Sequence, residues 1–294
     1  MKKKKTVLLI LAGFGVMFLG LIFMNFGTPL KTDVAVIPVR GGISPGAVEA
    51  SPSSVQNNIE EARSEGAQGF LFEINSPGGT VVASRQLEKT ISNIEEPTVC
   101  RFQDYATSGA YWAASACDEI VTDPLTLTGG IGVIASYLEY SEFMEEEGIE
   151  YVRLTGGELK DMGTPYRNIT EEERELFTRI LNETHTDFIE TVSENRNLTE
   201  DQAQTVGRGH VFTGTEAQEK RLTDYLGGRK KAKMIFEDSF NETVNFKEYG
   251  KDPGLIELLL GAERDTETRD TETKMEETSH STEMEVPRLY AVSN

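Results

Sequence analysis

The chain has 294 residues, of which 38% are hydrophobic and 8% aromatic, and this composition is sufficient for one or two domains with a buried core. Its formal net charge of -20 argues against the basic surface that binds nucleic acid, so no nucleic acid is expected as a partner. The three histidines, His185, His210 and His280, have no metal-ligand spacing, and neither a metal nor another cofactor is expected.

The N-terminus has the pattern of a membrane anchor. Four lysines at positions 2–5 precede an uncharged apolar run at 6–26, which as a helix would be roughly 31 Å long, enough to span a bilayer core. No small-residue cleavage motif follows this run, so we expect an uncleaved anchor rather than a removed signal peptide. The lysines place residues 1–5 inside the cell, and the chain from residue 31 onward then lies outside the cytoplasmic membrane.

Strand-like and helix-like patterns alternate between residues 34 and 226. The predicted elements are strands at 34–39, 69–74, 98–102 and 223–226, and helices at 53–64, 84–94, 109–116, 170–194 and 215–222. This alternation predicts an α/β domain with a largely parallel sheet, which we assign to residues 31–260.

The clearest predicted helix is the one at 170–194. Thr170 and Glu173 have the spacing of a capping box at its start. A stripe of apolar side chains follows at helical spacing, and core packing explains this stripe better than a binding site for a partner. The stripe consists of Phe177, Leu181, Phe188 and Val192.

The two cysteines, Cys100 and Cys117, have neither a metal-binding nor a redox-motif spacing. Both are flanked by apolar or small residues, which favours buried free thiols. A disulfide is the alternative for a domain outside the cytosol, and spacing alone does not decide between them.

The composition changes near residue 261, and residues 261–294 read as an acidic, mostly disordered tail in which RDTET occurs twice. The tail becomes apolar again at 286–292. One interpretation is a solvated end. The other is that residues 286–292 add as a strand to the protein's own substrate groove, held near it by the flexible linker.

Two loops that follow predicted strands contain the candidate chemistry, because α/β folds place their sites at the carboxyl ends of strands. The first loop, 75–79, ends in paired glycines whose amides could form an oxyanion hole, although a tight turn explains them equally well. The second, 106–111, contains Ser108 at a strand-to-helix junction. Ser108 is either a nucleophile with an exposed hydroxyl or only a helix N-cap.

A serine nucleophile needs a base. No histidine lies in a loop of this kind, which argues against a Ser-His-Asp triad. Lysine is the other candidate, provided that desolvation lowers its pKa. Lys160 lies between Glu158 and Asp161, whose charges would raise its pKa if they point toward it, so local sequence alone favours a surface lysine.

Taken together, these segments resemble signal peptide peptidase A of the short, single-repeat type. The matching stretches are VAVIPVRGGI (34–43), EINSPGGTVVAS (73–84), ATSGAYWAASACDEIVTDPLTLTGGIGVI (106–134), GELKDMGTPYR (157–167) and GHVFTGTEAQEKRLTDYLG (209–227). The resemblance implies a ClpP/crotonase-like fold and a serine peptidase with Ser108 as nucleophile, Lys160 as general base and the amide of Gly79 in the oxyanion hole. It also implies a homo-oligomeric ring in which serine and lysine meet across a subunit boundary.

One position departs from this family. Members often carry a serine where this chain has Gly130, and that serine helps to orient the lysine amine. Thr126, Thr128 or a water is expected to replace the missing hydroxyl, or the lysine is less well held.

The expected function is a membrane-bound endopeptidase that acts on signal-peptide remnants or other membrane-associated peptides. The alternative is a catalytically silent homologue that serves as a membrane scaffold or binding module, which only Gly130 supports. A crotonase-like acyl-CoA enzyme would require a cytosolic domain, and the predicted anchor argues against it.

Overall fold

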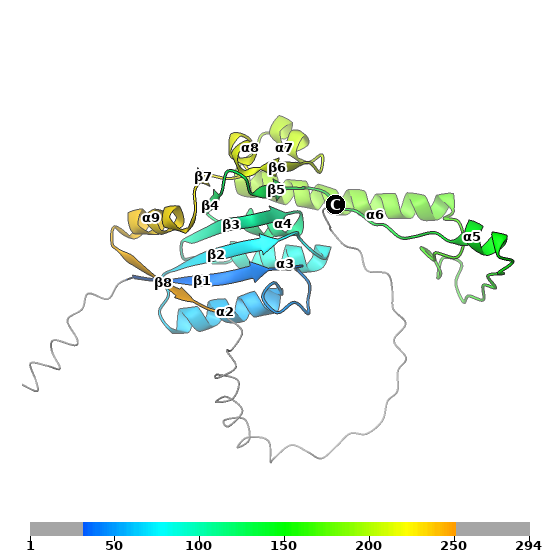
Figure 1. Ribbon diagram of the computed structural model, residues 1–294, viewed down its shortest axis with the longest axis horizontal. Helices are drawn as coiled ribbons and strands as arrows, with labels where there is room; N and C mark the ends of the chain where they lie inside the picture. Colours follow the sequence, from blue (N-terminus) through cyan, green and yellow to red (C-terminus); the bar gives the residue numbers. More distant parts are fainter. Residues whose placement is uncertain (1–31, 251–294) are drawn as a thin grey trace, which may run out of the picture.

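The computed structural model describes residues 32–250, in which one sheet carries helices on both faces (Figure 1). The predicted α/β class with a largely parallel sheet is confirmed. The expected anchor at 6–26 and the acidic tail at 261–294 lie outside the described residues. Within residues 32–250 the structure contains no helix that is both long and apolar enough to cross a membrane.

The strands in chain order are β1 (Thr32–Arg40), β2 (Gly69–Ser76), β3 (Thr98–Thr107), β4 (Glu119–Thr122), β5 (Leu127–Gly129), β6 (Val211–Thr213), β7 (Tyr225–Leu226) and β8 (Val244–Glu248). Their order in space is β6-β5-β3-β2-β1-β8, with β4 between the start of β3 and β7. The pairs of these strands are parallel, except that β6 runs antiparallel to β5.

The helices are α2 (Pro52–Ser64), α3 (Val81–Ser92), α4 (Gly109–Ala114), α5 (Ser141–Glu146), α6 (Glu171–Arg196), α7 (Glu200–Val206), α8 (Gly214–Glu219) and α9 (Arg229–Phe240). Each strand and helix predicted from the sequence is present, with ends shifted by a few residues. The short strands β4, β5 and β6, the helices α5, α7 and α9, and strand β8 are additions that the sequence patterns did not indicate.

The central strands are buried on both faces. Alternate side chains of β1 enter two different cores: Ala35 and Ile37 pack toward α2, α3, α4 and α6, whereas Val34 and Val36 pack toward α9. Phe70, Leu71 and Phe72 of β2 are all fully buried. Burial on both faces explains why these strands read as continuous apolar runs rather than as alternating patterns.

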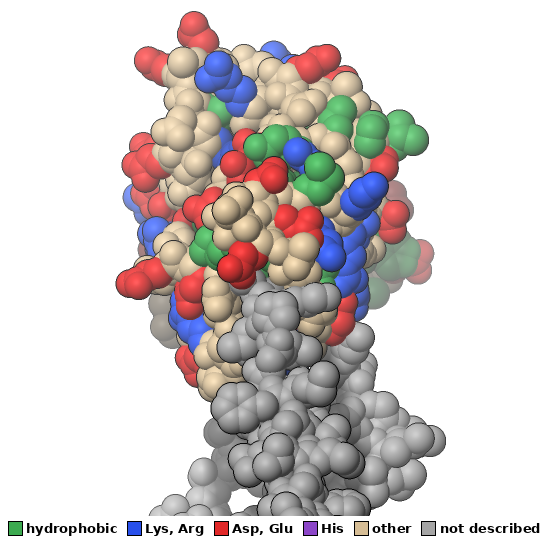
Figure 2. All heavy atoms as spheres, turned by 90° about the vertical axis from the view of Figure 1, so that its left-hand side faces the viewer, with side chains coloured by type: hydrophobic (Ala, Val, Ile, Leu, Met, Phe, Trp, Pro, Cys, Tyr) green, Lys and Arg blue, Asp and Glu red, His purple; other side chains and the backbone are tan. Residues whose placement is uncertain are grey.

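The surface at the α9 and β8 end of the sheet mixes acidic and basic side chains (Figure 2). Arg229 of α9 pairs there with Glu248 of β8 and lies 3.8 Å from Glu73 of β2. Acidic and basic side chains both occur over the part of this face that the described residues form (Figure 2).

Helix α6 is longer than the sheet beneath it. Its 26 residues span about 39 Å, and its N-terminal half extends beyond the domain beside the segment that contains α5 (Figure 1). We call residues 132–170 the arm. Phe188 and Val192 are buried in the core as predicted, but Phe177 and Leu181 are only partly buried. Half of the apolar stripe is therefore core, and the other half lies where α6 leaves the domain.

The predicted capping box of α6 is present. The Thr170 hydroxyl accepts a hydrogen bond from the Glu173 amide, and the Glu173 carboxylate accepts one from the Thr170 amide. The helix begins at Glu171, one residue after its predicted cap.

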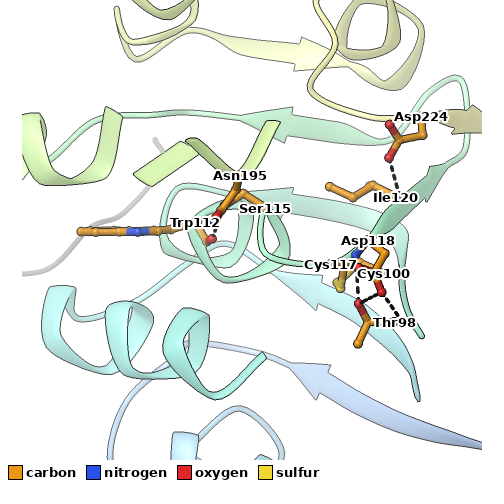
Figure 3. The surroundings of a disulfide bond; sticks show 9 residues. All are labelled: Thr98, Cys100, Trp112, Ser115, Cys117, Asp118, Ile120, Asn195 and Asp224. Atoms are coloured by element: carbon orange, nitrogen blue, oxygen red, sulfur yellow. Dashed lines mark hydrogen bonds between the residues drawn. A yellow bond between two sulfur atoms is a disulfide. The ribbon is translucent and has the colours of Figure 1, made fainter. Parts of the chain in front are cut away.

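The prediction of free thiols is wrong, because Cys100 and Cys117 form a disulfide (Figure 3). Both cysteines are buried, as expected. Cys100 lies in β3 and Cys117 just after α4, and the chain reverses between them, which brings their Cα atoms to 5.8 Å. Beside the disulfide, Thr98 and Asp118 exchange hydrogen bonds of 2.9 Å that hold the same two segments together. This proximity depends on the strand-helix reversal, which the spacing of the cysteines does not reveal.

We predict that the variant with both Cys100→Ala and Cys117→Ala has a lower free energy of unfolding than the wild type. The cross-link closes a loop of 17 residues, for which the chain-entropy contribution is about 3 kcal/mol. Denaturant unfolding of both proteins without reductant measures the difference. With reductant present, which breaks the disulfide of the wild type once it unfolds, the difference in free energy of unfolding should disappear. Two reactive thiols in the unfolded, unreduced wild type would contradict the assignment.

Candidate active site

The two candidate loops meet where β2 and β3 end. A side-chain carbon added to Gly78 would lie 2.8 Å from the Gly109 amide nitrogen and 2.9 Å from Cβ of Ser108. Gly78 also has φ +101°, a conformation that other residues rarely adopt. The loop therefore needs glycine here, and its backbone packs directly against the predicted nucleophile.

Ser108 has a strained backbone, with φ 54° and ψ -128°. Its amide donates to the Gly129 carbonyl at 2.8 Å and its carbonyl accepts from the Trp112 amide at 2.9 Å, which together fix the sharp turn from β3 into α4. Such strain in a residue other than glycine is a feature of functional turns, including the nucleophile turn of α/β-hydrolases.

The Ser108 side chain lies at the N-cap position of α4 but makes no capping hydrogen bond. Ser108 therefore has the position of an N-cap residue but does not make the hydrogen bond of one. The residue as a whole is buried, with 4% exposed. Ser108 contributes to the wall of a pocket.

The amide of Gly79 is available as a hydrogen-bond donor beside Ser108. Ile43 fixes the loop through its neighbours, donating to the Gly78 carbonyl at 2.8 Å and accepting from the Thr80 amide at 2.9 Å. Among residues 32–250 the Gly79 amide itself has no partner, and it lies 3.3 Å from where a side chain on Gly109 would begin.

Helix α3 begins directly after this amide. Thr80, its N-cap, makes no side-chain capping bond, so the positive end of the helix is not compensated by that side chain. A free amide and an uncapped helix start are suited to stabilising an anionic oxygen near Ser108.

The pocket that contains Ser108 has a volume of about 540 Å³. Three segments complete it: the stretch from Gly130 to Ile134, the part of α6 around Leu181 and His185, and the loop from Gly207 to Val211. Two of these segments, in α6 and in the loop before β6, were not assigned to a site in the sequence analysis.

His185 is a pocket residue that the sequence reasoning missed. Its Nε2 lies 2.7 Å from the Gly207 carbonyl oxygen, so a neutral ring donates there and retains Nδ1 as an acceptor. His185 was dismissed because it lies in no loop after a strand. Its helical spacing from Leu181 and Phe188, which places the three on one side of α6, was the signal that could have found it.

Gly130 has φ +63°, and a side-chain carbon there would lie 3.3 Å from the Ser108 amide nitrogen. The two threonines named as candidates to replace the missing hydroxyl are engaged with the backbone of β3. Thr126 donates its hydroxyl to the Gln103 carbonyl at 2.5 Å, and Thr128 donates to the Ala106 carbonyl at 2.7 Å. Both side chains are buried against β3 and serve the sheet.

Lys160 lies on the arm and is exposed. It does not line the Ser108 pocket. Helix α6 reaches that pocket at Leu181, whereas the segment containing Lys160 is attached to α6 at Glu173, which is about 12 Å further along the helix axis. A single chain thus brings Ser108 and Gly79 together but does not bring Lys160 to them.

Charged side chains hold the segment around Lys160 in place. Arg167 donates to both oxygens of Asp161 at 3.0 Å and also to Glu173, while Arg153 lies 2.8 Å from Asp161. Hydrogen bonds from Arg167 lower the pKa of Asp161, and the same guanidinium lowers the pKa of Glu173 to about 2. Asp161 is thus directed toward two arginines.

Comparison with known proteins places these features in a family. Residues 91–241 match the model of peptidase family S49. A Methanocaldococcus jannaschii protein named "Putative protease" is 31% identical over 191 residues, which cover 64% of this chain and 61% of that protein. A "Putative signal peptide peptidase" of Enterococcus faecium is 32% identical over 163 residues, covering 54% of this chain and 47% of the relative. A chloroplastic serine protease of Arabidopsis thaliana is 29% identical over 74% of this chain and 34% of its own length. The chain spans about half to three fifths of the first two relatives.

Proposed function

Because the chain belongs to peptidase family S49, we propose that it is a serine peptidase in which Ser108 is the nucleophile, Lys160 the general base and the Gly79 amide an oxyanion donor. The observation that carries this proposal is the strained Ser108, whose side chain makes no capping bond, in a pocket beside the free Gly79 amide. We also propose that the fold of the chain is of the ClpP/crotonase type.

The proposed chemistry is acyl transfer. The neutral amine of Lys160 takes the proton from the Ser108 hydroxyl as its oxygen bonds to the peptide carbonyl carbon. The carbonyl oxygen becomes negative and accepts a hydrogen bond from the Gly79 amide. The amide bond then breaks, the leaving amine takes the proton, and water hydrolyses the acyl-enzyme by the same steps.

In this proposal Lys160 comes from a second copy of the chain. Helix α6 separates Lys160 from Ser108 within one copy, so a complete site needs a homo-oligomer. The arm offers a surface for such contact, because Leu138, Phe143 and Leu154 are 69%, 58% and 92% exposed. Side chains of this kind are usually covered in an assembly.

The proposed substrates are signal-peptide remnants or other membrane-associated peptides, and the proposed location is the outer side of the cytoplasmic membrane. The relative named as a signal peptide peptidase supports the substrate class. The lysine-flanked apolar run at 6–26 supports the location. A catalytically silent scaffold is the alternative, and labelling by a serine-reactive fluorophosphonate distinguishes the two.

We predict that Ser108→Ala and Lys160→Ala each lower peptide hydrolysis by at least about 10³-fold without lowering the melting temperature. Lys160→Arg should fail as well, because a guanidinium keeps its proton near neutral pH. Hydrolysis by the wild type should rise with pH as Lys160 loses its proton. Hydrolysis of a fluorogenic peptide and fluorophosphonate labelling measure these effects.

His185→Gln is the matched control for the base. It replaces the imidazole that lines the Ser108 pocket and should retain most activity. If Lys160→Ala stays active and His185→Gln does not, the base is His185 and our assignment is wrong. If the wild type neither hydrolyses peptides nor reacts with the probe, the silent scaffold is correct.

Gly130 allows a separate prediction about the missing hydroxyl. Gly130→Ala and Gly130→Ser should both lower stability by about 1 kcal/mol, because φ +63° strains any side chain. The two variants share this loss of stability and differ by one hydroxyl, so the ratio of their kcat values isolates the effect of the hydroxyl. We expect the serine variant to be faster than the alanine variant, and equal rates would mean that the hydroxyl does not limit this enzyme.

The membrane location predicts that protease added to intact cells or spheroplasts digests the domain from residue 31 onward. The same treatment should leave residues 1–26 in the membrane fraction, because the anchor is not cleaved. A soluble mature form that begins after residue 26 would show instead that the apolar run is a removed signal peptide.

A further inference from the structure

The charged cluster on the arm suggests a role for a residue outside the proposed catalytic set. We propose that Arg167 is a positioning residue for Lys160: it fixes the lysine-bearing loop to α6 and keeps the carboxylate of Asp161 from pairing with the lysine. This inference rests on the proposed role of Lys160 as general base.

The first step is the geometry of the guanidinium. Nε of Arg167 donates to Oδ2 of Asp161 and Nη2 donates to Oδ1, both at 3.0 Å. Nη1 donates to Oε2 of Glu173, also at 3.0 Å. One planar fork thus binds two carboxylates, which a lysine ammonium at this position could not do with the same geometry.

The second step is the attachment to α6. Glu173 is 1% exposed and belongs to the capping box that starts the helix. Close packing adds to the ion pairs, since a side-chain carbon on Gly163 would lie 3.3 Å from the ring of Phe177. The loop that contains Lys160 is therefore held to the first turns of α6 by two residues that follow the lysine-aspartate pair, Gly163 and Arg167.

The third step connects this end of α6 to the serine. The Phe188 ring stacks on Trp112 with centroids 4.4 Å apart, and Trp112 lies in α4, the helix that begins after Ser108. One continuous helix joins the two parts. Helix α6 thus sets the position of Lys160 relative to the domain, because Arg167 fixes the lysine-bearing loop to the start of this helix.

The fourth step is charge. Asp161 follows Lys160 directly in the sequence, and the charged groups that face it are Arg153 and Arg167, with Glu173 of α6 on the far side of the guanidinium. Glu158 contributes its backbone carbonyl, which accepts from Arg153. Without Arg167, the ionised carboxylate would be less compensated and could attract the lysine ammonium. An opposite charge at close range favours the protonated amine, which is inactive as a base.

The experiment compares Arg167→Gln with Arg174→Gln in the full-length protein. Arg174 is the matched control, because it lies in the first turn of α6 next to Glu173 and pairs at 3.7 Å with Glu171 on an exposed surface. In Arg167→Gln we expect the rising limb of the pH profile of kcat/KM to shift by about one unit to higher pH. The resulting fall in turnover at neutral pH should be roughly tenfold, with KM nearly unchanged. Arg174→Gln should match the wild type.

Two further variants separate positioning from charge. Combining Arg167→Gln with Asp161→Asn removes the uncompensated carboxylate, so the pH limb should return toward that of the wild type while kcat stays reduced. Arg167→Lys should keep the pH limb and lose part of kcat, since it retains the charge but not the fork.

A wild-type pH limb and wild-type kcat in folded Arg167→Gln would overturn the inference. If that variant does not fold, Asp161→Asn alone serves. Arg153 and Arg167 then lose the Asp161 carboxylate, while Arg167 keeps Glu173, so the limb should move to lower pH and an unmoved limb would overturn the inference. Retained turnover in Lys160→Ala is a different result, which refutes the proposed base and not the structural role of Arg167.

Discussion

Ser108 and Gly79 lie side by side because the loops after β2 and β3 touch backbone to backbone. A side-chain carbon at Gly78 would come within 2.8 Å of the Gly109 amide nitrogen and 3.0 Å of the Thr107 carbonyl oxygen. Parallel pairing of β2 with β3 brings the two strand ends to the same edge of the sheet. The site therefore follows from sheet topology plus a few positions at which even one methyl group would be excluded.

Helix α6 separates the pocket that contains Ser108 from Lys160, the proposed general base. Its C-terminal half is ordinary core, with Phe188 against Trp112, while its N-terminal half supports the arm that contains Lys160. A helix that only completed the core could begin near Leu181. The additional length, together with the exposed apolar side chains of the arm, fits the proposed homo-oligomer. In the proposed assembly the same helix supports one site through its core half and presents a lysine to another.

The parts of the structure that were predictable are those with a local cause. The capping box at Thr170 and Glu173 is a short-range hydrogen-bond pattern, and it fixed the start of α6 to within one residue. The meeting of the loops at 75–79 and 106–111 followed from the rule that parallel strands end at one edge. Strands such as β5, with three residues, were missed because so short a run has no periodicity to detect.

The remaining features depend on contacts between distant segments. The pairing of Cys100 with Cys117 requires the reversal from β3 into α4, and His185 enters the pocket only because α6 crosses it. Thr126 and Thr128 look available in the sequence, yet the sheet uses both hydroxyls. The sequence left open whether Asp161 points toward Lys160. In the structure its carboxylate pairs with Arg153 and Arg167.

The strained residue Ser108 and the disulfide belong to the same segment, which consists of β3, a sharp turn and α4. A residue other than glycine at φ 54° costs about 1–3 kcal/mol, and such a conformation persists only where the surroundings impose it. The disulfide joins β3, before the turn, to the end of α4, after it, and contributes a stabilisation of similar size. Tyr111 adds a second restraint within α4, since its buried hydroxyl donates to the Leu222 carbonyl at 2.8 Å. The turn that presents Ser108 is thus clamped at both ends, and relaxing it would require breaking the cross-link or the core contacts of α4.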